Sequence, residues 1–237
     1  MFLSEGIRGY DLHAKTVCLT FDDGPGETRS AGDPGPRTLE LAQFLHDRNI
    51  TATFFMIGEF VEQHRGIVDE VSKLGHLIGN HTYDHTNLGG QSRAFVVKQI
   101  TQTDQLLRDV PTFRRYFRPP QGELSESLVT ELNSTEETKS YVGPILWAIP
   151  TRENDRKTAD WRYWEGRKSA KACAEAYIAD IEAAGHGIIL MHDGLHEKPK
   201  RSGMYPLEMA TLVVNWLQKN GYEFASLDSV VRAQRSP

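Results

Sequence analysis

The sequence predicts an α/β fold, built as a distorted, incomplete barrel of the (β/α)7 type. Short apolar runs rich in Val, Ile and Phe alternate along the chain with amphipathic stretches at helical spacing. That alternation is typical of a parallel sheet surrounded by helices. The chain has 237 residues, and α/β barrels of about 200 to 250 residues form one domain. We therefore expect a single domain over residues 1–237.

Seven apolar runs are expected to be strands, and six amphipathic segments between them are expected to be helices. The strands are predicted at 16–21, 52–57, 77–80, 116–118, 142–149, 187–191 and 223–226. The helices are predicted at 38–47, 59–74, 93–107, 123–132, 170–183 and 206–219. Two segments are expected to be long loops. They are the Gly- and Pro-rich segment 26–37 and the charged segment 150–168, which carries Trp161, Tyr163 and Trp164.

The composition excludes several functional classes. Lys and Arg number 27 against 32 Asp and Glu, which gives a net charge of −5 with no basic cluster for nucleic acid. Since no apolar run approaches the roughly 18 residues of a membrane span, we expect none. Cys18 and Cys173 lie too far apart in sequence to indicate a disulfide framework or a Cys-based zinc motif.

The first residues, Met-Phe-Leu-Ser-Glu-Gly, lack the basic and apolar regions of a signal peptide. We therefore expect no signal peptide in this chain. That leaves two locations open, the cytoplasm and the cell exterior, the second for a domain whose signal has been removed.

Polar residues follow several of the expected strands, where barrel enzymes carry their functional groups. The first strand ends in Thr-Phe-Asp-Asp-Gly-Pro, which includes Asp22 and Asp23. One carboxylate of such a pair can bind a metal while its neighbour, pointing elsewhere, takes a proton from water. The alternative is turn chemistry, because Asp-Gly-Pro is a common turn sequence.

The third strand leads into His81 and His85, four residues apart and able to reach one cation if the backbone makes a helical turn. The alternative is a pair of ordinary surface histidines. Together with Asp23 they give a His2Asp set, which leaves a coordination position open for water, as in catalytic zinc sites.

Two further strands end in polar residues. The fourth leads into Arg118-Pro-Pro-Gln121-Gly, which alone indicates a rigid turn with a surface charge. The sixth delivers His192 after an apolar run, either as a core histidine or as an acid that protonates a leaving amine near neutral pH.

The order T-F-D-D-G-P, H-T-x-x-H, R-P-P-x-G and L-x-H resembles the polysaccharide deacetylases of carbohydrate esterase family 4, the NodB-homology domain. The resemblance implies a distorted (β/α) barrel that removes acetyl groups from N-acetylglucosamine polymers such as chitin, peptidoglycan or exopolysaccharide. It implies that Asp23, His81 and His85 hold one divalent metal ion. Zinc suits two imidazoles and a carboxylate, and cobalt, nickel or manganese are alternatives.

The same resemblance assigns the catalytic roles. Asp22 is the expected general base and His192 the general acid, while Arg118 holds Asp22. The backbone N–H of Gln121 is expected to face the oxyanion. Metal-assisted attack of water on the acetyl carbonyl would then release acetate and the free amine.

Two motifs depart from the family pattern. Only the second half of the fourth motif, D-x-x-D-W, is present at Asp160 and Trp161, with Lys157 in place of the first Asp. We expect Asp160 to pair with His192, and Trp161 to wall the acetyl pocket with Leu190. The alternative is a loop anchored by an aromatic side chain. Gln121 replaces a usual aromatic, and the 26–37 loop is longer than usual.

Other functions remain open on the same residues. An O-acetylxylan esterase, or a hydrolase of sugar-linked formamides or cyclic amides, would use the same fold. A carbohydrate-binding protein with a vestigial site is the alternative from another class. Exposed Trp161, Tyr163 and Trp164 are expected to stack on sugar rings or to pack inside the loop. The sequence does not indicate an oligomeric state.

Overall fold

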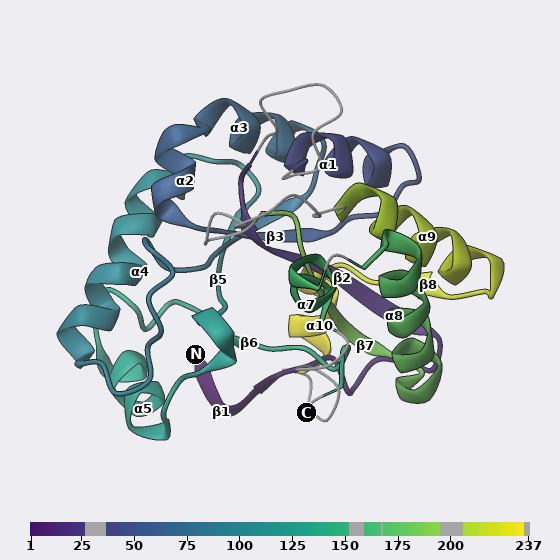
Figure 1. Cartoon of the computed structure of the whole chain (residues 1–237). Helices are drawn as coiled ribbons and strands as arrows, with labels where there is room; N and C mark the ends of the chain where they lie inside the picture. Colours follow the sequence, from purple (N-terminus) through teal and green to yellow (C-terminus); the bar gives the residue numbers. More distant parts are fainter. Residues whose placement is uncertain (27–36, 152–158, 167, 195–205, 235–237) are drawn as a thin grey trace.

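The computed structural model describes residues 1–26, 37–151, 159–166, 168–194 and 206–234, in which helices surround a parallel sheet (Figure 1). The described strands are β1 Phe2–Ile7, β2 Thr16–Gly24, β3 Thr53–Met56, β4 Leu77–Asn80, β5 Phe113–Phe117, β6 Gly143–Ile145, β7 Gly187–His192 and β8 Glu223–Phe224. The described helices are α1 Thr38–His46, α2 Gly58–Gln63, α3 Arg65–Lys73, α4 Arg93–Leu107, α5 Glu126–Ser134, α7 Asp160–Glu165, α8 Ala170–Ala184, α9 Pro206–Lys219 and α10 Leu227–Ala233, with a 3-10 turn η1 at Pro120–Gly122. The predicted α/β fold class is confirmed.

The main sheet brings the ends of several strands to one edge. Its order is β5-β4-β3-β2-β7, with β8 pairing at the start of β2, and each pair is parallel. In this register Asp22 of β2 lies opposite His192 of β7, and Asn80 of β4 lies opposite Met56 of β3. Parallel strands share the edge that carries their carboxyl ends, so residues far apart in sequence meet there.

The segment 142–149 closes the barrel only in part. It was predicted as one strand, but only Gly143–Ile145 is a strand, and it pairs with β1. On either side, Val142 makes a single bridge to Tyr116, and Ile149 makes one to Ile189 of β7. Pro144 and Pro150 lack the N–H that a regular ladder needs. In the described part of the chain, single bridges join the ends of the sheet, which confirms an incomplete, distorted barrel.

Four other elements differ from the prediction. The helix predicted at 59–74 is two helices, because His64 has φ −131° and ψ 39°. Val61 and Val68, on either side of this break, both face the core seven residues apart, so the apolar spacing resembles that of one continuous helix. The short elements β1, α7 and α10 were missed. α7 lies within the expected loop 150–168, of which residues 152–158 and 167 are outside the described residues, as are 27–36 of the loop 26–37.

Local signals explain where the helices begin. Ser92, Ser125, Ser169 and Ser226 precede α4, α5, α8 and α10, and each side chain accepts a hydrogen bond from the backbone N–H three residues later. This contact satisfies one of the N–H groups that a helix start leaves unpaired. Serine caps therefore fix the starts of these four helices.

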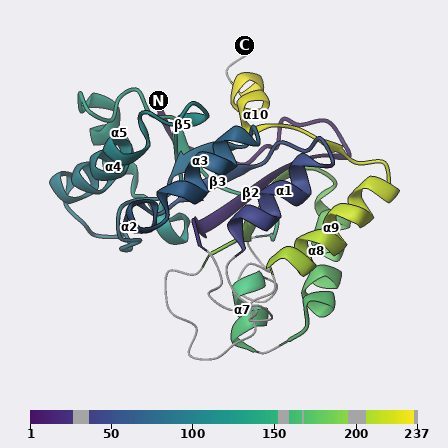
Figure 2. The same ribbon diagram turned by 90° about the horizontal axis from the view of Figure 1, so that it is seen from above.

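Most of the helices pack against the sheet, and α7 lies at one of its edges. The largest apolar cluster packs β2, β3 and β7 against α1, α3, α8 and α9, and a smaller one joins β1 to α4 and α5. Figure 2 shows α7 and α10 on opposite sides of the molecule. Within the described residues, no helix combines the length and the apolar character needed to cross a bilayer.

We expect Phe54→Ala to lower the free energy of unfolding by about 3–5 kcal/mol, because it opens a cavity in the main core. The Phe54 side chain is fully buried, stacks on Phe21 at 5.2 Å between ring centroids and meets the edge of His76 at 5.5 Å. Urea unfolding followed by circular dichroism measures the loss. Phe54→Leu keeps more of the volume and should lose less. A loss under about 1 kcal/mol for Phe54→Ala would contradict the assigned packing.

Candidate active site

The adjacent carboxylates of Asp22 and Asp23, at the end of β2, both approach Nε2 of His81 because the strand bulges there. Neighbouring side chains of a regular strand point to opposite faces. The pairing of β2 with β3 skips one residue between Asp22 and Gly24, and the extra residue, Asp23, has a φ of 72°. Such a bulge re-aims a side chain. Asp22 Oδ2 lies 3.6 Å and Asp23 Oδ1 3.4 Å from His81 Nε2. The expectation that the two carboxylates point apart was therefore wrong.

The two histidines approach the same place from an irregular turn after β4. The described backbone between them makes no helical turn, and Thr82 and His85 have φ of 69° and 59°. His81 Nδ1 lies 2.7 Å from the carbonyl oxygen of Arg118, so in the neutral imidazole this nitrogen carries the proton and Nε2 has the lone pair. His85 Nε2 lies 3.2 Å from Asp23 Oδ1.

Asp23, His81 and His85 fit a divalent cation. Asp23 Oδ1 is buried and accepts no hydrogen bond from the described residues. One ligand atom from each residue lies within 4.8 Å of the others. The distances from Asp23 Oδ1 to the two Nε2 atoms, 3.2 and 3.4 Å, match the separation of about 3.3 Å between ligands of tetrahedral zinc. A carboxylate with two imidazoles is also a donor set that zinc prefers.

Burial and charge act in opposite directions on these groups. Burial raises the pKa of Asp23, but the nearby imidazoles of His81, His85 and His192 outweigh it and hold the pKa below its usual range. Burial lowers the pKa of His81, while the charges of Asp22 and Asp23 raise it above the ordinary value. Asp23 is therefore an anion at neutral pH, as a metal ligand must be.

Arg118 is a buried residue whose guanidinium contacts several segments around the site. Its side chain is fully buried, and Nη1 donates to Asp22 Oδ1 at 2.7 Å and to Thr20 Oγ1 at 2.9 Å. Nε and Nη2 donate to the carbonyl oxygens of residues 145–146 at 2.9 and 3.3 Å, and the guanidinium lies 4.3 Å from the ring centre of Phe55. The alternative of a surface charge in a rigid turn is therefore wrong. Arg118 contacts Asp22, as expected.

His192, the last residue of β7, makes two hydrogen bonds with the carboxylate of Asp160. Its Nδ1 lies 2.7 Å from Asp160 Oδ1, and its backbone N–H donates to Oδ2 of the same carboxylate at 2.7 Å. Burial lowers the pKa of His192, but the charge and hydrogen bond of Asp160 outweigh it, and with Asp23 and Asp22 they raise it to about 10. The imidazole is therefore protonated at neutral pH.

Asp160 reaches His192 because α7 begins there. The carboxylate is fully buried at the first position of this helix, and its backbone N–H donates to Tyr177 Oη at 3.3 Å. Tyr177 in turn donates to the carbonyl of Leu190 at 2.9 Å. The expected pairing of Asp160 with His192 is thus present in the structure. Trp164 is buried and meets the imidazole edge-on at 6.3 Å between ring centres, so it is not an exposed stacking surface.

Three other predicted residues lie around the site without contacts that establish their roles. Gln121 has φ 59°, and its side chain accepts a hydrogen bond from Asn87 Nδ2 at 2.6 Å. Leu190 is buried in β7, and the ring of half-buried Trp161 lies 4.4 Å from the Arg162 guanidinium. The oxyanion role of Gln121 and the pocket walls stay predictions. Lys157 lies outside the described residues.

Asp193 is a buried carboxylate next to His192 that was not predicted from the sequence. It is fully buried, accepts a hydrogen bond from Thr38 Oγ1 through Oδ2, and leaves Oδ1 without a partner among the described residues. Burial raises its pKa to about 7. Asp193 joins the end of β7 to the first residue of α1. The sequence signal was the His-Asp pair after an apolar strand.

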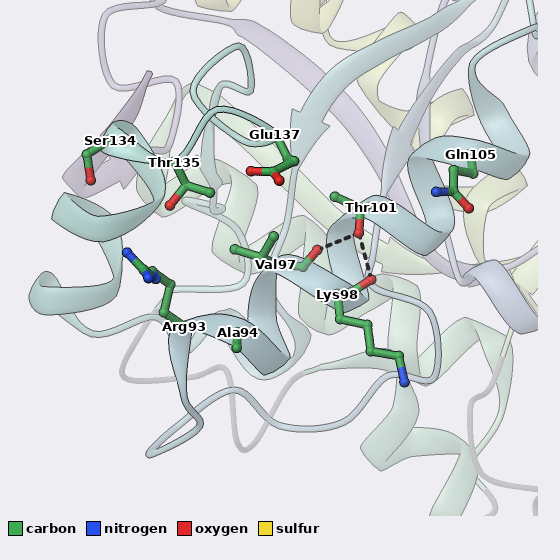
Figure 3. Close-up of a pocket in the computed structure, with 9 residues that line it drawn as sticks. All are labelled: Arg93, Ala94, Val97, Lys98, Thr101, Gln105, Ser134, Thr135 and Glu137. Atoms are coloured by element: carbon green, nitrogen blue, oxygen red, sulfur yellow. Dashed lines mark hydrogen bonds between the residues drawn. The ribbon is translucent and has the colours of Figure 1, made fainter.

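A separate groove of about 660 Å³ lies between α4 and the segment after α5 (Figure 3). Arg93, Lys98 and Glu137 are its charged lining residues. It is lined by none of the carboxylates and histidines described above, so it is not part of this site.

We expect Asp160→Asn to lower the pKa of His192 from about 10 toward its ordinary range, because the imidazolium loses its anionic partner. NMR titration of the histidine ring protons over the alkaline range measures this change. Tyr177→Phe, which removes only the hydroxyl that contacts the Asp160 backbone, is the control and should leave the pKa high. An unchanged titration in Asp160→Asn would refute the electrostatic role of this residue.

Comparison with known proteins places these residues in a family. A family model described as polysaccharide deacetylase matches residues 9–138. The chain is 29% identical over 218 residues to the peptidoglycan-N-acetylglucosamine deacetylase PgdA of Listeria monocytogenes, covering 91% of this chain and 39% of that protein. It is 30% identical over 181 residues to a chitooligosaccharide deacetylase of Azorhizobium caulinodans, covering 76% and 74%. The chain thus spans about 39% of the length of the Listeria relative.

Solved structures have the same fold. The Bc1960 peptidoglycan N-acetylglucosamine deacetylase superposes with a TM-score of 0.69 at 25% identity, covering 92% of this chain and 88% of that one. A Bacillus anthracis protein described as a family pseudoenzyme gives 0.68 at 18% identity, covering 92% and 65%. The motifs predicted the family correctly: the chain belongs to the polysaccharide deacetylase family.

Proposed function

We propose that this chain is a metal-dependent hydrolase that removes N-acetyl groups from N-acetylglucosamine-containing oligosaccharides or polysaccharides and releases acetate. One observation carries the proposal. Asp22 Oδ2 and Asp23 Oδ1 lie 3.6 and 3.4 Å from His81 Nε2, and Asp23 Oδ1 lies 3.2 Å from His85 Nε2. His192 lies opposite Asp22 in the sheet. The proposed base, acid and ligand set thus lie at the carboxyl edge of one sheet, an arrangement suited to metal-assisted amide hydrolysis.

Asp23, His81 and His85 would hold the cation, with zinc the best match to the donor set. When bound, a divalent cation supplies positive charge that acidifies water and polarises the acetyl carbonyl. The second imidazole nitrogen of His81 is held by the Arg118 carbonyl, a contact that fixes ring orientation in metal sites.

The remaining residues move protons and stabilise charge. Asp22, oriented by Arg118, takes a proton from the attacking water. The backbone N–H of Gln121 donates to the oxyanion that develops on the acetyl carbonyl. His192, cationic at neutral pH, then protonates the departing sugar nitrogen, because an amide anion is a poor leaving group.

The substrate class follows from chemistry and relatives together. Proteins named for peptidoglycan N-acetylglucosamine and for chitooligosaccharides both appear among the relatives, and both substrates carry an N-acetylglucosamine amide. A cationic acid is needed more for an amine leaving group than for the alcohol released from an O-acetyl ester. We therefore place N-acetyl hydrolysis before the O-acetylxylan, formamide and cyclic amide alternatives. A carbohydrate-binding protein would not need the His192–Asp160 pair.

The test of function is acetate release from N-acetylglucosamine oligomers and from peptidoglycan by the purified protein. Release should stop after chelation and return when zinc or cobalt is restored, because the ligand set needs its cation to acidify water. Acetate release that survives full chelation would refute the metal requirement. Release only from O-acetylxylan, or turnover only of formamide substrates, would refute the proposed substrate class.

We expect Asp22→Asn to reduce kcat by about 10²- to 10⁴-fold while zinc binding is retained, because the variant loses the proton acceptor but keeps all three proposed ligands. Its amide oxygen can still accept the hydrogen bond from Arg118. Asp23→Asn is the matched comparison one residue away, and it should lose zinc as well as turnover. Acetate release and zinc competition with a chelator give the two readouts. Full activity in Asp22→Asn would show that another group is the base.

A further inference from the structure

The turn that carries His85 is held in an unfavourable backbone conformation. Thr82 and His85 have φ of 69° and 59°, a region that side-chain-bearing residues rarely adopt, and Thr82 is also β-branched. Such a conformation persists only where surrounding contacts impose it. His85 contributes one of the proposed ligands, so whatever holds this turn also places that ligand.

Side chains supply the support. Five consecutive backbone N–H groups, those of residues 82 to 86, each donate to a side-chain oxygen. Asn80 accepts from the first at 3.0 Å, Thr82 Oγ1 accepts from His85 at 3.2 Å, and Asp84 accepts from the last at 2.9 Å. The turn therefore depends on a few specific side chains rather than on a helix or a strand ladder.

Gln99 of α4 makes three of the contacts to this turn. Its Oε1 accepts from the N–H groups of Tyr83 and Asp84 at 2.8 and 3.2 Å, and its Nε2 donates to Asp84 Oδ2 at 2.8 Å. The side chain is only 3% exposed. A side-chain amide has an acceptor oxygen and a donor nitrogen on the same carbon, which matches these three contacts.

The opposite face of the turn is also fixed. The carbonyl oxygens of Thr82 and Tyr83 accept from the N–H groups of Gly58 and Glu59, the first residues of α2, at 2.9 and 2.8 Å. The turn is thus held between the start of α2 and the buried face of α4. Only the α4 side is made by a single side chain, so Gln99 is the point at which a substitution can release it.

We propose that Gln99 is a positioning residue for the metal centre, which sets cation affinity by holding the 82–86 turn and, through it, His85. The proposal rests on the metal centre of the proposed function and adds a residue that is neither a proposed ligand nor a proposed acid or base. Residues that orient metal ligands typically change affinity by about 10- to 100-fold when they are replaced.

The test is the zinc dissociation constant of each purified variant, measured by competition with a chromogenic chelator. Gln99→Met keeps the length and removes the acceptor and donors, and we expect about 10- to 100-fold weaker zinc binding. Val96→Ala is the matched control on the same helix. This substitution shortens a buried apolar side chain that makes no hydrogen bond to the turn. The variant should bind zinc as the unaltered protein does.

A second test, in case Gln99→Met fails to fold, reverses the direction of the hydrogen bond between residues 99 and 84. Gln99→Glu keeps the acceptor for both N–H groups but opposes a second carboxylate to Asp84, so zinc binding should weaken. Adding Asp84→Asn restores the bond with its direction reversed, and affinity should recover. Circular dichroism and thermal unfolding confirm the fold of each variant.

Three results would overturn the inference. They are near-unaltered zinc affinity in folded Gln99→Met, an equal loss in Val96→Ala, or no recovery in the Gln99→Glu, Asp84→Asn double variant. Absence of zinc binding by the unaltered protein would instead refute the metal centre itself, and this inference with it. Failure of the inference and failure of the proposed function are therefore distinguishable.

Discussion

The buried ion pair between Arg118 and Asp22 is the interaction on which the rest of the site depends. A fully buried guanidinium is costly unless its N–H groups are paired, and here they reach Asp22, Thr20 and the carbonyls of residues 145–146. Because the guanidinium is a rigid fork, these partners fix β2, β5 and the segment that partly closes the barrel at set positions. The Arg118 carbonyl also holds His81, so one residue places both the proposed base and a proposed ligand.

The sequence was sufficient to predict the gross arrangement of the site but not its local geometry. Apolar runs locate most strands, and parallel strands bring their carboxyl ends to one edge, so the sequence alone places His81 and His192 near Asp22. The bulge at Asp23 and the positive φ of His85 were not predictable, because turn residues such as Asp-Gly-Pro are compatible with several backbone paths. Burial of Arg118 escaped prediction since it depends on long-range partners. The short elements β1 and α7 escaped because few of their residues face the core.

The fold does not decide activity, since a solved structure named as a family pseudoenzyme superposes on this chain as well as enzymes do. The proposed hydrolysis therefore depends on particular side chains. The β2 bulge matters most here, because without it Asp22 and Asp23 would face opposite sides of the sheet. A chain could keep both aspartates in sequence and still lose the site if that bulge were straightened.

The proposed acid and the proposed ligand set are supported from different parts of the chain, and this separation has an electrostatic consequence. Asp160 of α7 contributes more to the high pKa of His192 than Asp23 and Asp22 do. A bound cation would offset the charges of Asp22 and Asp23 at His192, but it would leave the direct hydrogen bond with Asp160 in place. The proposed acid therefore keeps its own anionic partner when the ligand set is occupied. The proposed proton donation by His192 and the proposed cation binding by Asp23, His81 and His85 are therefore compatible at neutral pH.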